Sequence, residues 1–157
     1  MGLKQDLFVV AQSFSVLNPY NIFNPDPNVI SLDENVPTEV LSIDVCVKKL
    51  NKTKVSLDSM VQIAILDIIG DEDSISFAVS YDLLRNGIPI TFINDLMDIA
   101  TPGDGNIFRY TNFPNFPVID NDPIFGMNNY ALVCTRFQGP TFVFAGSRSL
   151  KATVITL

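Results

Sequence analysis

The chain has 157 residues, of which 47% are hydrophobic and only 17% are charged, and its 17 acidic and 10 basic residues give a net charge of −7. An acidic chain without a basic stripe is repelled by nucleic acid, and no apolar run reaches the ~18–20 residues that a membrane-spanning helix needs. Because the chain has no histidine, Ser-His-Asp and Cys-His catalytic arrangements and His-rich metal sites are excluded.

The first predicted element is a strand over Leu7–Leu17, with a β-bulge near Ala11 and Gln12, where the alternation slips. Residues 1–7 are either an arm that adds a strand to a neighbour's sheet or a frayed terminus. The first ten residues lack the charged-then-apolar layout of a secretory signal. We therefore expect either synthesis in the cytoplasm without a signal peptide or a mature chain that has lost its leader.

A long loop is predicted over Asn18–Pro37, because four prolines rule out a helix or a central strand, with one short extended piece at Val29–Leu32. Apolar residues alternate with polar ones over Thr38–Leu50, which predicts a half-buried strand. Asn51–Ser56 reads as a polar turn. Alternation and β-branched residues favour another strand over Met60–Ile69.

Ser74–Ile93 is the clearest pattern in the chain. Its first half places Ile75, Phe77, Val79, Tyr81 and Leu83 on one face, which is the period of a strand with one buried side. Asn86-Gly87 then supplies the positive φ angles of a two-residue hairpin turn. The sequence therefore predicts a β-hairpin here, followed by a helical turn at Asn94–Asp98.

Thr101–Phe125 is rich in glycine and proline and reads as loop, with only Asn106–Tyr110 extended. A strand is predicted over Asn129–Phe137, and Thr141–Gly146 with Ser149–Thr156 form a final hairpin or bent strand. About eight strands with no convincing helix predict an all-β, two-sheet antiparallel jelly-roll sandwich, formed as a single domain over residues 1–157.

Two acidic clusters, Asp71-Glu72-Asp73 and Asp120-Asn121-Asp122, carry the oxygen ligands that calcium prefers. Asp120 and Asp122 are the better calcium candidates, because Asn115, Asn121 and backbone carbonyls lie near them in sequence. The alternative is that both clusters are solvated acidic turns. A pair of carboxylates could also act as acid and base, but among 17 acidic residues some pair is always available, so we expect no enzyme.

The cysteines, Cys46 and Cys134, lie in separate predicted strands without metal-ligand spacing. They are either two buried free thiols, an intrachain disulfide or an intermolecular one.

Aromatic side chains crowd one loop-rich region. In a monomer some of them would be exposed and would mark an interface; otherwise the loops fold back and cover the sheets. The residues are Phe108, Tyr110, Phe113, Phe116 and Phe125.

The run Val55–Ile63, followed by Ser76–Ile90, resembles small jelly-roll surface proteins of spore-forming bacteria. These include exosporium and endospore appendage components and the tip domains of collagen-like glycoproteins, which are similar to tumour-necrosis-factor-like domains. The resemblance consists of a strand, a Leu-Asp-Ser turn, a second strand and an Arg-Asn-Gly hairpin. The chain lacks a collagen-like region and has no cysteine in residues 1–45, so it resembles a tip or stand-alone module.

The resemblance implies a structural, non-enzymatic protein of a spore coat, exosporium or appendage, made without a signal peptide. It implies self-association as trimers or filaments, and contact with other spore surface proteins. An aromatic-rich β-sandwich with few charges is independently suited to pack against copies of itself. The alternative function is a carbohydrate- or receptor-binding jelly roll, such as a phage or viral fibre head.

Overall fold

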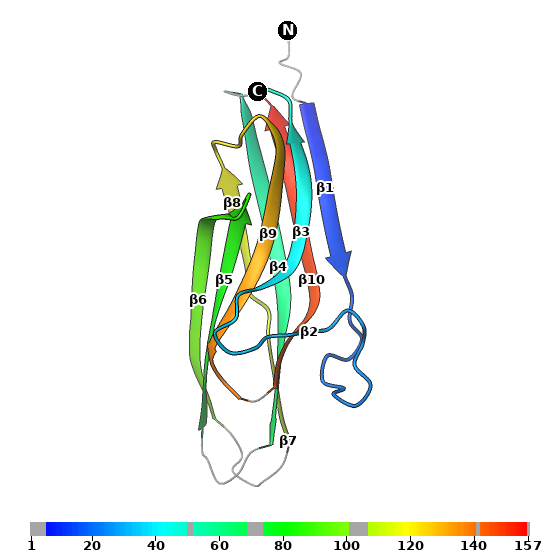
Figure 1. Ribbon diagram of the computed structural model, residues 1–157, viewed down its shortest axis with the longest axis vertical. Coiled ribbons are helices and arrows are strands. Elements are labelled where there is room, and N and C mark those ends of the chain that lie inside the picture. Colours follow the sequence, from blue (N-terminus) through cyan, green and yellow to red (C-terminus); the bar gives the residue numbers. More distant parts are fainter. Residues whose placement is uncertain (1–5, 50–51, 69–73, 101–106, 141, 157) are drawn as a thin grey trace.

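The computed structural model describes residues 6–49, 52–68, 74–100, 107–140 and 142–156, and these form a β-sandwich of two sheets (Figure 1). No described segment is a helix long and apolar enough to cross a membrane. The strands, in chain order, are β1 (Asp6–Phe14), β2 (Ile30–Ser31), β3 (Thr38–Val47), β4 (Thr53–Ile68), β5 (Ser74–Arg85), β6 (Ile88–Ala100), β7 (Ile107–Asn112), β8 (Asn115–Asp120), β9 (Gly126–Gln138) and β10 (Phe142–Thr156).

The strand order confirms the predicted jelly roll. One sheet has the order β1-β10-β4-β7, with β2 beside β10 and β8 beside β4, and the other has the order β3-β9-β5-β6. We count β7 and β8 as one interrupted strand and set the two-residue β2 aside, which leaves eight principal strands. They are arranged 1-8-3-6 and 2-7-4-5, which is the double Greek key of a jelly roll.

The core lies between the sheets, and its alternation follows the sequence pattern. On β5, Phe77, Val79, Tyr81 and Leu83 are 0–1% exposed, as the hairpin pattern predicted. The side chains that fill the centre are Leu32, Val45, Val47, Leu57, Ile63, Ile65, Phe77, Tyr81, Leu83, Tyr130, Leu132 and Leu150. Each sheet therefore covers the apolar face of the other.

The predicted hairpin turn is confirmed, since Asn86 and Gly87 both have positive φ, 50° and 79°. The helical turn predicted at Asn94–Asp98 is wrong, because β6 continues through it to Ala100 and pairs with β5 along its length. The sequence signal for this strand was that Phe92, Asn94 and Leu96 share one face, but Asp95 and Asp98 obscured it.

Three other predictions need correction. The polar turn at Asn51–Ser56 is wrong from Thr53 onward, because β4 begins there and buries Val55 and Leu57. The bulge at Ala11 and Gln12 is absent, since β1 pairs with β10 without a register shift. Asp6 and Leu7 belong to β1 and pair with the same chain, so they are no arm; residues 1–5 lie outside the described residues.

β8 was missed in the predicted loop because Pro117 lies in its middle. Pro117 is opposite Asp58 of β4, and β8 lies at the margin of its sheet. A proline is tolerated in an edge strand, where its missing N–H faces away from the ladder. The inward positions of β8 bury Phe116, which is 9% exposed.

The last segment is a single bent strand, which was one of the two predicted alternatives. β10 pairs with β4 in two registers, with a shift between Ala145 and Arg148. A Cβ at Gly146 would lie 2.6 Å from Oε1 of Gln62, so a larger residue there would displace the end of the Gln62 side chain. The Ser147 N–H donates to the same Gln62 oxygen at 3.0 Å, which holds the bend.

The burial of Phe116 predicts unequal effects for two neighbouring aromatic residues. Phe116→Ala removes a core side chain and is expected to lower the free energy of unfolding by about 3–5 kcal/mol. Phe113→Ala, at a side chain that is 56% exposed, is expected to change it by less than about 0.5 kcal/mol. Urea unfolding followed by circular dichroism measures both, and equal losses would contradict the placement of Phe116.

Candidate functional site

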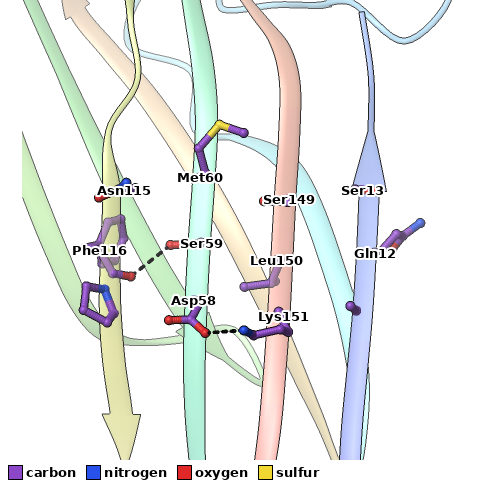
Figure 2. A pocket seen from close by; sticks show the side chains of 12 residues that line it. Gln12, Ser13, Asp58, Ser59, Met60, Asn115, Phe116, Ser149, Leu150 and Lys151 are labelled. Carbon is purple, nitrogen blue, oxygen red and sulfur yellow. Dashed lines mark hydrogen bonds and ion pairs between the residues drawn. The ribbon is translucent and has the colours of Figure 1, made fainter.

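A shallow groove of about 630 Å³ lies on the outer face of the six-stranded sheet (Figure 2). Its lining residues are Ala11, Gln12, Ser13, Asp58, Ser59, Met60, Asn115, Phe116, Pro117, Ser149, Leu150 and Lys151. Nζ of Lys151 lies 2.9 Å from a carboxylate oxygen of Asp58, and both side chains are half exposed. Of the serines in the groove, Ser59 donates its hydroxyl to the main-chain carbonyl of Phe116 at 3.4 Å.

The predicted long loop covers the other half of the same sheet face. The hydroxyl of Tyr20 donates to the carbonyl of Tyr110 at 3.2 Å and also contacts the hydroxyl of Thr111. Ala64 and Leu66, which point outward from β4, are consequently only 0% and 6% exposed. This loop is therefore a packed structural cover.

The predicted metal residues fall in a buried polar cluster at the end of β8. Nη1 of Arg85 donates to both carboxylate oxygens of Asp120, at 2.9 and 2.8 Å, and to the carbonyl of Asp122 at 2.5 Å. The hydroxyl of Tyr130 donates to Asp120 at 2.7 Å. Burial, together with the hydrogen bond to Asp120, raises the pKa of Tyr130 above its usual range. The cluster ties β5, β8 and β9 together.

This geometry leaves Asp120 without a free oxygen, because both already accept hydrogen bonds from Arg85. Among the described residues there is no group of three or more His, Cys, Asp or Glu that could hold a metal ion. Calcium at Asp120 and Asp122 stays a prediction, and it requires Arg85 to give way. The other acidic cluster, Asp71-Glu72-Asp73, lies outside the described residues.

A second buried polar group lies inside the sandwich beside β6. The side-chain amide of Asn112 donates to the carboxylate of Asp95, which joins β7 to β6 across the gap between the sheets. The hydroxyl of Tyr81 is buried without a hydrogen-bond partner, and burial raises its pKa beyond its ordinary value. The hydrogen bond between Asn112 and Asp95 therefore links the margins of the two sheets, and the Asp95 side chain lies on the inner side of β6.

The two cysteines are both free thiols. Cys134 is fully buried, as predicted, and burial raises its pKa. Cys46 is exposed on β3, so the predicted buried thiol is wrong there, and the intrachain bridge is not formed. Cys46 points outward because it alternates with the buried residues Val45 and Val47.

The predicted aromatic interface is not brought together. Phe116 is in the core and Tyr110 packs against it, so neither is an interface residue. Phe113 and Phe125 are 56% and 65% exposed but lie beyond opposite ends of β8. The backbone of Phe108 lies in β7, and its side chain is outside the described part of the chain.

Sequence reasoning also missed a row of exposed apolar residues on β6. Ile88, Phe92 and Leu96 are 69%, 65% and 72% exposed, on a strand that pairs on one side only, with β5. In Figure 1, β6 forms the outer margin of its sheet. A long apolar edge strand is a site for pairing with another chain.

Neither a protein-family profile nor a curated protein matches the sequence. Similar solved structures include dimeric latent PorU from Porphyromonas gingivalis, with a TM-score of 0.43, 8% identity, and coverage of 97% of this chain and 13% of that chain. They also include infectious bursal disease virus, Gx strain, with a TM-score of 0.43, 10% identity, and coverage of 98% and 32%. The VP2 subviral particle of the same virus has a TM-score of 0.40, 10% identity, and coverage of 97% and 37%. The chain thus spans about a third or less of these proteins, and scores this low say nothing about what it does.

The ion pair of Asp120 with Arg85 is more buried than that of Asp58 with Lys151. We therefore expect that removing the two aspartates lowers the free energy of unfolding by different amounts. Asp120→Ala leaves Arg85 and Tyr130 without their partner and is expected to lower the free energy of unfolding by about 3–5 kcal/mol. Asp58→Ala, which removes the exposed partner of Lys151, is the matched control and is expected to cost less than about 1 kcal/mol. Equal melting temperatures of the two variants in calorimetry would contradict the assigned role of the cluster.

The exposures of the two thiols predict their reactivity. In native protein Ellman's reagent is expected to modify Cys46 alone, because Cys134 is buried and its raised pKa disfavours the reactive thiolate. In denaturant both thiols are expected to react. Rapid modification of the one remaining thiol in native Cys46→Ser protein would show that Cys134 is accessible.

Proposed function

We propose that this chain is a structural, non-enzymatic jelly-roll protein that assembles with copies of itself. The observation that carries the proposal is β6, a thirteen-residue edge strand whose outward face exposes three large apolar side chains. Monomeric sheet proteins protect their edges with proline, lysine or short strands. β6 carries Pro89 beside its hairpin turn, but from Ile90 to Ala100 it contains no proline, glycine or basic residue, so this stretch is suited to pairing with a second chain.

The polar groups of the described residues support a structural role over catalysis. Arg85, Asp120 and Tyr130 are used in bonds that join strands. Arg148 is 5% exposed, and its guanidinium donates to the carbonyls of Val40, Asn28 and Gly146, which holds the long loop against the sheet. Every one of these groups has a stabilising partner and none faces the groove.

We place this assembly, as a finer proposal, on the surface of a bacterial spore, in its coat, exosporium or an appendage. This part rests on the resemblance of Val55–Ile63 and Ser76–Ile90 to such proteins. It includes contact with other spore surface proteins. The binding-module alternative is less well supported, because the exposed aromatics Phe113 and Phe125 lie apart and the outer groove presents no exposed aromatic side chain for a sugar ring to stack on.

Self-assembly predicts a mass in solution above that of the monomer. Multi-angle light scattering on the purified chain, across a range of protein concentrations, is expected to show an oligomer. Adding a reductant is expected to leave the mass unchanged, because the contact is made by strands and not by Cys46. A monomer at all concentrations would overturn the proposal and favour a screen for glycan binding.

A further inference from the structure

We propose that two copies of the chain pair through β6 in an antiparallel, two-fold contact centred on Asn94. The inference rests on the proposed self-assembly and identifies the surface that makes it. Such a contact would join the two four-stranded sheets into one continuous sheet across both copies. Main-chain hydrogen bonds would supply attraction, and side chains would determine the register.

β6 is the sheet margin best suited to this contact. The other margin of its sheet is β3, whose exposed outward residues Glu39, Asp44 and Cys46 include no large apolar side chain, while β8 in the opposite sheet carries Pro117 in its middle. Charges and proline discourage edge pairing. β6 has a proline only at its hairpin end, Pro89, and besides Asp98 it exposes Ile88, Phe92 and Leu96. β1 is also an apolar edge, and at nine residues it is shorter than β6.

The register follows from the sequence of β6. The strand runs from Ile88 to Ala100, and Ile90 is an extra residue in its pairing with β5, so a two-fold axis at Asn94 pairs the regular stretch Thr91–Met97 with its copy. In an antiparallel pair on this axis, each residue of one copy lies opposite the residue of the second copy that is equally far from Asn94 on the other side. Phe92 then lies opposite Leu96 of the second copy on the outer face, and the reverse pair forms as well.

Charge complementarity selects this register over its neighbours. With the axis at Asn94, Asp95 lies opposite Ile93, so no two carboxylates face each other within Thr91–Met97. Moving the axis to Asp95 places two Asp95 carboxylates directly opposite, which is unfavourable. Moving it to Ile93 places Phe92 opposite Asn94 and loses the aromatic–aliphatic pair.

The charges of β6 already have partners within one chain, so they do not oppose pairing. Asp95 accepts a hydrogen bond from Asn112 on the inner side. The Ser76 hydroxyl donates to Asp98 at 2.6 Å from the neighbouring strand β5. The outward side of β6 therefore presents Phe92 and Leu96 on either side of an amide. A two-fold contact closes a dimer, and a trimer or filament would need a second surface.

Disulfide trapping tests the axis. In a Cys46→Ser background, Asn94→Cys places the new thiol of one copy opposite the new thiol of the other. Their Cα atoms are then separated by about 4.5–5.5 Å, which a disulfide accepts. Oxidation with copper–phenanthroline is expected to give a reductant-reversible band of twice the monomer mass on a denaturing gel. Leu96→Cys and Asp98→Cys, whose copies lie about 14 and 27 Å apart along the strands, are matched controls expected to stay monomeric on the gel.

A charge exchange tests the side-chain pairs independently. Phe92→Lys with Leu96→Lys places lysines opposite each other and is expected to reduce the light-scattering mass to that of the monomer. Phe92→Lys with Leu96→Glu places opposite charges across the same axis and is expected to restore the oligomer. Leu17→Lys with Phe23→Lys, at loop side chains that are 99% and 94% exposed, adds the same charge and is expected to keep it.

The outcomes separate this inference from the proposed function. If the wild type is oligomeric and a disulfide forms in the Leu96→Cys or Asp98→Cys variant but not in the Asn94→Cys variant, the proposed register is overturned. An oligomer that crosslinks at none of the three positions overturns β6 as the contact while self-assembly stands. A wild type that is monomeric throughout overturns both, and circular dichroism confirms that each variant is folded.

Discussion

The structure depends on one constraint, which is that each sheet must bury one apolar face and only the other sheet can cover it. The fully buried residues come from both sheets, with Val45, Tyr81 and Leu132 on one and Leu57, Ile63 and Leu150 on the other. Because side chains alternate along a strand, this burial also fixes the register, since a slip by one residue would turn a whole row of apolar side chains to solvent. Burial therefore determines which strands pair and which surfaces stay outside.

Polar groups that this packing takes into the interior must find partners there, and their partners explain several local features. Arg148 lies behind the bend in β10 and is buried among main-chain carbonyls, with its guanidinium carbon 4.7 Å from the centre of the Phe14 ring. Burial lowers its pKa, although a guanidinium stays charged. Arg85 and Asp120 pair at the other end. These contacts anchor the long loop and the β8–β9 connection.

The same constraint does not provide the strands at the sheet edges with a pairing partner on their outer side. A sandwich covers faces but has open margins, and this protein has a proline in the middle of β8 and charges on the outward face of β3, while β6 exposes Ile88, Phe92 and Leu96. The outer face of the six-stranded sheet is divided, because the loop that carries Tyr20 covers one half and the shallow groove occupies the other. The surface thus points to contact with other protein chains through an edge, and the groove is secondary to it.

The sequence by itself determined the β class and the local hairpin, because alternation and the Asn86-Gly87 turn are properties of neighbouring residues. It could not show that Asn94–Asp98 is strand, since two aspartates there mask an alternation that only pairing with β5 makes favourable. Nor could it show that Phe116 is core while Phe113 is exposed, or that Asp120 belongs to Arg85, which lies 35 positions earlier. Those outcomes were decided by the tertiary structure, because burial and ion pairing depend on which distant strands meet.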